Sequence, residues 1–342
     1  MILVTGAAGH LGANLVRRLA ADQADLRLLV RPATDRGALA GLHADLVEGD
    51  LTDLAACRQA VRGVRRIYHC AAQISTHYGA EQAIFRNNVL GTRNLLLAAA
   101  EAGVERVVVS GSFSATGHRA DRPTDESEPF NPLEPHLPYA FSKAAVEHEC
   151  LKACAEGLPV VVAVSCAILG PYDFMPSRMG RVLQRFARRR ILAYVPGGFE
   201  FVAARDIVEG HILSMARGRP GQKYIFSTRF ANFDELMTLF ARVTGQPKPP
   251  LRLPPALMGV AARLAEPVMR LLLPGTPQLL TPAAIRLLRM GRRVDCAKAR
   301  DELGYRATDI ESAVEEAYRW FVDTGRIDRP AHGFAAAGLQ QE

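Results

Sequence analysis

Short apolar runs alternate with amphipathic stretches along the first half of the chain. Each run is rich in Val, Ile and Leu, and after it the apolar residues recur at helical spacing, as Leu11, Leu15 and Leu19 do. The predicted strands are Ile2–Val4, Leu26–Val30, Leu46–Leu51, Ile67–Ala72, Glu105–Ser110 and Val160–Val164. Strands that alternate with helices are typical of a parallel sheet. We therefore expect an α/β fold with a Rossmann-type, doubly wound parallel sheet.

The alternation breaks down beyond Gly170, where helical patterns dominate. This predicts a smaller, mainly helical C-terminal lobe, although Lys223–Phe226 has the pattern of a strand that returns to the main sheet. We expect a first domain over residues 1–165, a second, substrate-binding lobe over residues 166–325 and a tail over residues 326–342.

The turn after the first strand carries Gly6, Gly9 and Gly12 and leads into a helix. In this context the three glycines allow a tight turn, a close backbone approach to a pyrophosphate and close packing of helix on strand. The helix N-terminus then presents free N–H groups and a positive dipole end to the anion. We expect the turn to bind a dinucleotide, with Ala8, His10 and Leu11 in the same segment. A plain structural turn is the alternative.

The second predicted strand is followed by Arg31, at the position where a dinucleotide fold reads the adenosine ribose. An acidic residue there would accept from the 2′-hydroxyl and favour NAD. A guanidinium can pair with a 2′-phosphate, so Arg31, with Arg36 shortly after it, favours NADP(H) over NAD(H). The alternative is a solvated arginine.

Tyr139 and Lys143 lie four residues apart in a predicted helix that begins near Pro138, hence on one face of it. A phenol with an ordinary pKa of about 10 is a poor acid or base at neutral pH. A nearby ammonium group and a nicotinamide cation would favour the phenolate and lower the pKa of Tyr139. Ser112, at the end of the fifth strand, could then hydrogen-bond the substrate oxygen while Tyr139 transfers the proton.

These features resemble the extended short-chain dehydrogenase/reductase family over most of the chain. The matching segments are the glycine turn, Asp50-Leu51, Ala71-Ala72, Asn88-Val89, Gly91-Thr92, the serine-bearing strand end, Tyr139 with Lys143, and Gly170-Pro171. The resemblance implies an NAD(P)-dependent enzyme whose catalytic residues are Ser112, Tyr139, Lys143 and Asn88. The cofactor is expected to lie against Asp50, Leu51, Ala71, Ala72, Ser165, Cys166 and Ile168.

Within the family, Leu29-Val30-Arg31-Pro32 and the segment 194–207 look most like the hopanoid-associated sugar epimerases and their dihydroflavonol-reductase-like relatives. Two features depart from the pattern. Ser165-Cys166 stands where relatives usually carry a proline after the sixth strand, beside the expected nicotinamide. Gly111 interrupts the serine segment and leaves Ser110 or Ser114 as substitutes for Ser112.

Two segments of the second half remain open. Arg178, Arg181, Arg185 and Arg188 recur at helical spacing, so they form either a basic stripe for a nucleotide-sugar diphosphate or acyl-CoA, or a solvated face. Residues 251–273 are strongly apolar and fit core packing, an apolar lid over the substrate or a membrane-surface helix.

Composition narrows the classes of protein that remain. The formal net charge of +7 suits an anionic ligand, but we expect no nucleic-acid partner. The six cysteines show no metal-ligand spacing, so we expect reduced thiols and no metal site. No run of about 18 uncharged apolar residues occurs, so stable membrane insertion is not expected, while surface association stays open. A strand at Ile2 leaves no room for a signal peptide ahead of it, which favours the cytoplasm.

The leading hypothesis is an NADPH-dependent oxidoreductase acting on a ketone, an aldehyde or the corresponding alcohol of a fairly apolar small molecule. A nucleotide-sugar epimerase or dehydratase with a tightly retained cofactor is the alternative. A non-catalytic dinucleotide sensor is a third, although such proteins often lose the tyrosine or lysine. The family resemblance also implies a homodimer through the helices that bear Asn88 and Tyr139.

Overall fold

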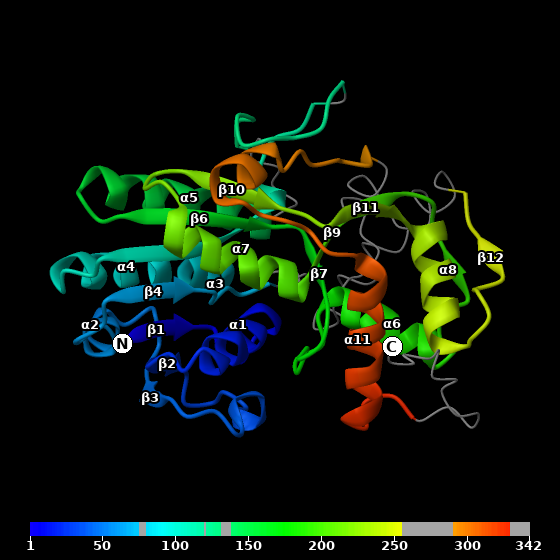
Figure 1. Ribbon diagram of the computed structural model, residues 1–342, viewed down its shortest axis with the longest axis horizontal. Helices are drawn as coiled ribbons and strands as arrows, with labels where there is room; N and C mark the ends of the chain where they lie inside the picture. The colour runs from blue at the N-terminus through cyan, green and yellow to red at the C-terminus, as the bar shows by residue number, and fades with distance from the viewer. Residues whose placement is uncertain (75–79, 120, 131–137, 255–289, 329–342) are drawn as a thin grey trace, which may run out of the picture.

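The computed structural model describes residues 1–74, 80–119, 121–130, 138–254 and 290–328. Its centre is a sheet of seven parallel strands in the order β10-β6-β5-β4-β1-β2-β3 (Figure 1). The strands are β1 Ile2–Thr5, β2 Leu26–Val30, β3 Asp45–Glu48, β4 Arg66–His69, β5 Arg106–Ser112, β6 Val160–Ser165 and β10 Lys223–Phe226. The α/β, doubly wound architecture is confirmed, and β10 returns to the main sheet as expected.

Helices cover both faces of this sheet. One face carries α2, α4 and α5, which contact one another, and the other carries α1 and α7 (Figure 1). The bounds are α1 His10–Ala21, α2 Leu54–Ala60, α4 Gly91–Glu101, α5 Pro138–Ala155 and α7 Ala204–Arg217. In a doubly wound sheet the ligand site lies beyond the carboxyl ends of the strands. Here Thr5, His69, Ser112 and Ser165 share that edge.

The second lobe is mainly helical and has its own core. It holds α6 Arg178–Ala187, α8 Phe233–Thr244 and α11 Ile310–Asp323, with strands β7 Ala167–Leu169, β9 Gly198–Ala203 and β11 Arg229–Asn232 in one small sheet. A two-stranded sheet pairs β8 Ala193–Tyr194 with β12 Leu251–Arg252. Figure 1 shows α11 beside α6 and next to α8.

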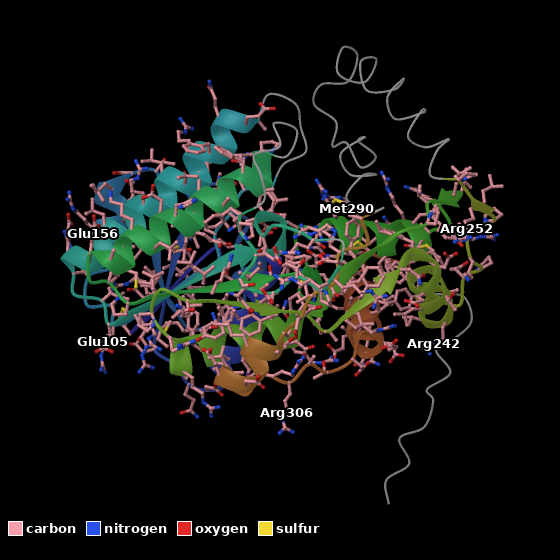
Figure 2. All side chains as sticks on the ribbon, turned by 90° about the horizontal axis from the view of Figure 1, so that it is seen from above. Glu105, Glu156, Arg242, Arg252, Met290 and Arg306 are labelled. Atoms are coloured by element: carbon pink, nitrogen blue, oxygen red, sulfur yellow. The ribbon has the colours of Figure 1, made fainter. Side chains whose placement is uncertain are left out.

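The apolar core of the protein consists of two clusters, one in each lobe. Buried residues of the main sheet form one apolar cluster, and Leu183, Phe240 and Phe321 belong to a second one in the smaller lobe. Ile327, which we expected in the tail, is only 3% exposed and packs in this second cluster. Much of the charge lies on the periphery, as Glu105, Glu156, Arg242 and Arg306 do in Figure 2.

Two predicted features fall partly outside the described residues: residues 255–273 of the apolar stretch and residues 329–342 of the tail. Among the described helices, none is long and apolar enough to cross a bilayer.

Candidate active site

The glycine turn packs directly against the end of β4. Gly6 has a φ of 71°, and a Cβ there would lie 2.6 Å from the amide nitrogen of Ala71. α1 then begins after Gly9, which offers no side chain to cap it. The first N–H groups of α1 thus face the carboxyl edge of the sheet without a side-chain cap, as an anion site needs.

Two other residues of this segment have structural contacts. The His10 ring nitrogen Nε2 lies 3.2 Å from the carbonyl oxygen of Gly170 and 3.1 Å from that of Pro171, so this side chain links the glycine turn to the loop after β7. Leu11 packs against the main core, and Ala8 is 8% exposed. These residues contribute backbone and shape to the turn.

Asp50 and Arg31 lie together at the end of β2 and β3, where the adenosine half of a dinucleotide is expected. Burial raises the pKa of Asp50, but hydrogen bonds from Thr52 and the charges of Arg31 and Arg86 outweigh burial and lower it. Asp50 Oδ1 accepts from the Thr52 amide and hydroxyl, both at 2.8 Å. Arg31 is exposed, whereas Arg36 is already paired with Glu48.

Leu51 follows Asp50 at the expected adenosine end of the site. Its Cβ would lie 3.0 Å from a Cβ placed on Gly91, so α4 approaches the chain closely at this point. Its carbonyl oxygen accepts from the Asn94 side chain at 3.0 Å.

Ser112 and Tyr139 form the centre of the site. The Tyr139 phenol lies close enough to the Ser112 side chain for the serine to lower its pKa, and the Ser112 hydroxyl is 2.8 Å from that of Ser114. Burial raises the pKa of Tyr139 by more than Ser112 and the charge of Arg178 lower it. This differs from the expected lowering by Lys143, because the groups that lower the pKa here are Ser112 and Arg178.

Lys143 is buried and points toward the sheet. Its Nζ donates to the carbonyl oxygen of Ser110 at 2.8 Å, and burial lowers its pKa to about 8. Two buried histidines flank it. Burial and the lysine charge lower the pKa of His69 to about 3, and burial lowers that of His211 to about 4.

The lowered pKa values keep both rings neutral, and the hydrogen bonds then set their tautomers. His211 Nδ1 donates to the carbonyl oxygen of Ile207 at 2.8 Å, so in the neutral ring Nε2 accepts from Ser110 at 2.8 Å. His69 Nε2 lies 2.9 Å from the Thr92 hydroxyl, and the Thr92 hydroxyl donates to the carbonyl oxygen of Asn88 at 2.6 Å. His69 was not among the expected site residues, and it serves here as a satisfied core residue.

Asn88 supports the site from behind. It lies in a π-helical segment, Arg86–Leu90, between α3 Glu81–Phe85 and α4, and it is 2% exposed. Its amide Nδ2 donates to Gln73 at 3.1 Å and to the Ser142 hydroxyl at 3.0 Å, and its Oδ1 accepts from the Gln73 amide at 2.7 Å. Asn88 thereby joins the end of β4 to α5, between Tyr139 and Lys143.

The remaining predicted cofactor residues line the same edge. Ala71 follows β4, its amide donates to the Thr5 hydroxyl at 3.4 Å, and Ala72 is exposed next to it. Ser165 ends β6 and donates to the carbonyl oxygen of Gly111 at 3.5 Å. Cys166 is buried, with its pKa raised well above the ordinary value by burial, and Ile168 lies in β7.

Arg292 is a residue that sequence reasoning missed. Its guanidinium, on a residue 8% exposed, donates to the carbonyl oxygens of Thr116 at 2.6 Å and Gly117 at 2.8 Å. It also stacks 4.2 Å above the Phe113 ring, next to Ser112. No sequence signal marks this residue, because about 180 positions separate it from the loop that it holds.

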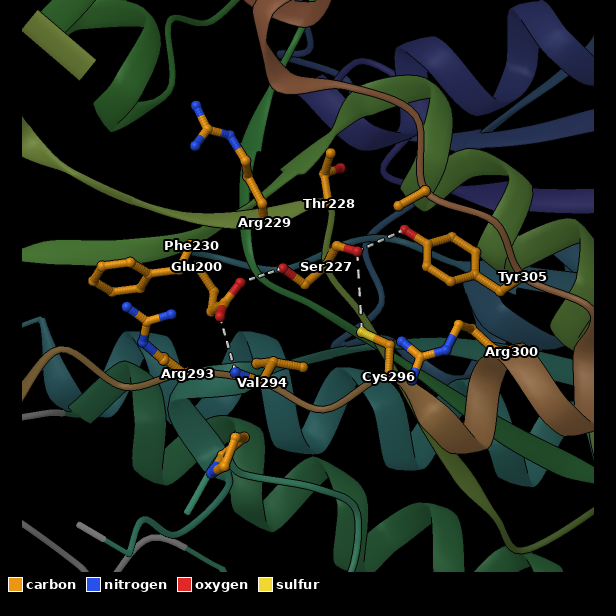
Figure 3. Close-up of a pocket in the computed structure, with 12 residues that line it drawn as sticks. Glu200, Ser227, Thr228, Arg229, Phe230, Arg293, Val294, Cys296, Arg300 and Tyr305 are labelled. Atoms are coloured by element: carbon orange, nitrogen blue, oxygen red, sulfur yellow. Dashed lines mark hydrogen bonds between the residues drawn. The ribbon is translucent and has the colours of Figure 1, made fainter. Parts of the chain in front are cut away.

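A cavity of about 380 Å³ opens between β9, β11 and the segment that precedes α11 (Figure 3). Buried Glu200 accepts from the Ser227 hydroxyl at 2.5 Å and from the Val294 amide at 2.9 Å. Two arginines that line it are already paired, Arg229 with Glu311 and Arg300 with Asp295.

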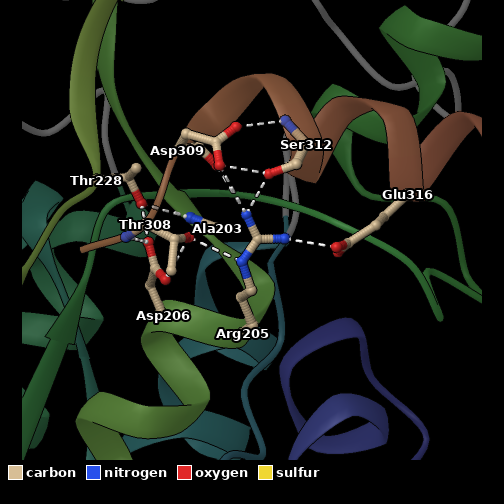
Figure 4. A network of polar contacts seen from close by, with 8 residues as sticks. All are labelled: Ala203, Arg205, Asp206, Thr228, Thr308, Asp309, Ser312 and Glu316. Atoms are coloured by element: carbon tan, nitrogen blue, oxygen red, sulfur yellow. Dashed lines mark hydrogen bonds and ion pairs between the residues drawn. The ribbon is translucent and has the colours of Figure 1, made fainter. Parts of the chain in front are cut away.

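A polar network fixes the second lobe relative to the sheet (Figure 4). At the start of α7, Arg205 donates to the Thr308 hydroxyl at 2.8 Å and to Glu316 at 2.6 Å. Asp206, 2% exposed, accepts from the Thr228 hydroxyl at 2.5 Å and from the Thr308 amide at 3.0 Å. α11 is therefore tied directly to the helix that covers the main sheet.

Comparison with known proteins identifies a matching family and similar relatives. Residues 2–226 match the NAD dependent epimerase/dehydratase family. The chain is 40% identical to sterol demethylase protein B of Methylococcus capsulatus over 95% of this chain and 99% of that protein. It is 32% identical to a putative dihydroflavonol 4-reductase of Synechocystis over 95% of both chains.

A solved structure shares the whole architecture. The nucleoside-diphosphate-sugar epimerase PA4631 from Pseudomonas aeruginosa is 26% identical and superposes with a TM-score of 0.78 over 96% of this chain and 99% of that one. The likeness therefore spans both the parallel sheet and the smaller lobe.

Proposed function

The chain belongs to the NAD-dependent epimerase/dehydratase family of extended short-chain dehydrogenases/reductases, and from that premise we propose that it is an NADP(H)-preferring oxidoreductase. It reduces a ketone or aldehyde of a fairly apolar small molecule, or oxidises the corresponding alcohol. The observation that carries the proposal is the proximity of the Tyr139 phenol to the Ser112 side chain at the carboxyl edge of the sheet.

Gly6 lets the turn lie directly against the end of β4, because a side chain there would strike the backbone of Ala71. The uncapped start of α1 would hold the pyrophosphate, and Arg31 and Asp50 would hold the adenosine half. The nicotinamide, when bound, supplies or accepts the hydride.

The protein's own groups handle the substrate oxygen and its proton. Ser112 donates a hydrogen bond to that oxygen, and Tyr139 delivers the proton during reduction. Burial raises the pKa of Tyr139, so the phenol stays protonated near neutral pH, which suits a proton donor. Lys143 and Asn88 hold the helix that presents Tyr139 against β5 and the end of β4.

The names of two relatives support a substrate class. A protein 40% identical over nearly the whole of both chains is named for sterol demethylation, and another is named as a reductase. We therefore propose that the substrates are lipophilic fused-ring alcohols or ketones of the sterol type.

The test compares Tyr139→Phe with the wild type. The variant should lose turnover by about 100-fold or more, since positioned acid–base groups contribute roughly that much, while its NADPH affinity stays within twofold. Turnover would be followed by nicotinamide absorbance with sterol ketones and with nucleotide sugars. Unchanged turnover in Tyr139→Phe would contradict the proposal.

A nucleotide-sugar epimerase is the second candidate, favoured by the likeness to the P. aeruginosa epimerase. In that reaction the cofactor is reduced and reoxidised within one cycle. Copurification of a cofactor and conversion of a nucleotide sugar without net absorbance change would identify it.

We also propose a homodimer through α3, α4 and α5. Phe85 and Phe141 are 43% and 39% exposed and stack with ring centroids 5.9 Å apart, and Leu97 and Leu151 are also exposed on these helices. Such an apolar face is typical of an interface. Light scattering should give a dimer for the wild type and a monomer for Phe85→Asp combined with Phe141→Asp.

A further inference from the structure

One segment of the second lobe carries positive charge without any acidic residue. Between Asp173 and Glu200 the sequence holds six arginines and no acidic residue, whereas the formal net charge of the whole chain is +7. The six are Arg178, Arg181, Arg185, Arg188, Arg189 and Arg190.

These arginines are displayed outward. α6 buries Met179, Leu183 and Phe186 against the second core, and all six arginines are exposed. Arg178, Arg181, Arg185 and Arg188 follow a helical repeat and lie along one face. None of the six forms an ion pair with another described residue.

Apolar side chains flank the basic segment. Met175 is 61% exposed before α6, and Leu192 is 71% exposed after it. Leu251, 56% exposed, lies beside Leu192, since its amide donates to the Leu192 carbonyl oxygen at 3.4 Å. Basic residues with exposed apolar side chains at their margins are the composition of membrane-surface segments.

The segment also adjoins the site. Arg178, at the first turn of α6, is close enough to the Tyr139 phenol for its charge to lower the pKa of that phenol. A surface that received this face would therefore lie near the catalytic tyrosine.

We propose that the basic face of α6, with Met175, Leu192 and Leu251, docks on the surface of an anionic phospholipid bilayer. Charge complementarity selects the partner, because an acid-free cationic segment is attracted to anionic headgroups and its apolar flanks enter the interface. Docking brings the active site to the place where lipophilic molecules concentrate. This last consequence rests on the proposed function, while the docking itself does not.

The test is flotation of the full-length protein with vesicles of phosphatidylcholine alone or with added phosphatidylglycerol. Arg185, Arg189 and Arg190 have side chains without hydrogen bonds or ion pairs to described residues, so Arg185→Glu/Arg189→Glu/Arg190→Glu should fold normally. The matched control is Arg62→Glu/Arg66→Glu/Arg306→Glu, which changes the net charge equally at exposed positions elsewhere. Thermal melts would verify that both variants are folded.

Wild type and control should bind the anionic vesicles and not the neutral ones. The α6 variant should bind about 100-fold more weakly, at roughly fivefold per arginine, with unchanged NADPH affinity. The proposal would be overturned if the control variant lost vesicle binding as much as the α6 variant, or if the α6 variant bound as tightly as the wild type. It would also be overturned if the wild type bound no vesicles, or bound duplex DNA more tightly than vesicles. A failure of Tyr139→Phe to lose turnover would leave the vesicle result intact, so the two proposals are tested separately.

Discussion

Lys143 Nζ donates a 2.8 Å hydrogen bond to the carbonyl oxygen of Ser110, two residues before Ser112 on β5. The Ser110 hydroxyl donates in turn to His211 Nε2 at 2.8 Å. Ser110 of β5 therefore contacts both Lys143 of α5 and His211 of α7. The lysine, the serine strand and the tyrosine helix are held as one unit, whose order depends on the Lys143 side chain.

Replacing Lys143 with Met should reduce turnover by about 100-fold, because it removes a buried charge and the bond that sets α5 against β5. The wild-type rate should fall as pH rises through about 8, where the ammonium loses its proton. The measurement is kcat against pH for both proteins. A Lys143→Met enzyme with the wild-type rate and the same alkaline limb would show that the lysine has neither role.

The buried histidines make the fold sensitive to acid. His211 stays neutral in the folded protein down to a pKa of about 4, whereas in the unfolded chain it takes up a proton below about 6.5. Proton uptake by the unfolded state means that stability falls as pH drops from about 6.5 toward 4, by up to about 3 kcal/mol for this residue.

Urea unfolding near pH 8 and near pH 5 would measure this loss. His211→Gln keeps a polar side chain without the titration, so its unfolding free energy should change less between the two pH values. An equal change in both proteins would assign the acid sensitivity to other groups.

Arg292 should matter for turnover without touching the reacting atoms. Arg292→Met leaves three carbonyl oxygens near Ser112 without their donor, so Ser112 loses its fixed position. We expect kcat to fall about tenfold or more, at roughly 1.4 kcal/mol per tenfold, with NADPH affinity unchanged. Arg292→Lys, which restores one cation, should recover part of kcat, and equal losses in both variants at unchanged melting temperature would contradict a positioning role.

The sequence was informative where local chemistry decides the structure. The strand and helix alternation and the tight turn at Gly6 follow from short segments, and the predicted sheet was confirmed. The direction of the Lys143 side chain did not follow, because its acceptor lies on another strand and its spacing from Tyr139 constrains only the helix face. Arg292 could not be predicted either, since its partners come from a loop far away in sequence.

Cofactor preference can be tested at a pair of matched arginines. Arg31 is exposed and its charge reaches Asp50, at the adenosine end of the predicted site, whereas Arg36 is already paired with Glu48. Arg31→Ala should weaken NADPH binding by about 10- to 100-fold, because a charge-assisted hydrogen bond contributes roughly 1.5–3 kcal/mol, and should leave NADH binding nearly unchanged. Arg36→Ala should alter neither, since it removes a surface ion pair of small net value. Titration of both cofactors against the three proteins decides the point. If the wild type bound NADH as tightly as NADPH, or if the two variants behaved alike, Arg31 would not read a 2′-phosphate. That result would favour the epimerase, which retains NAD, over the NADPH-dependent oxidoreductase.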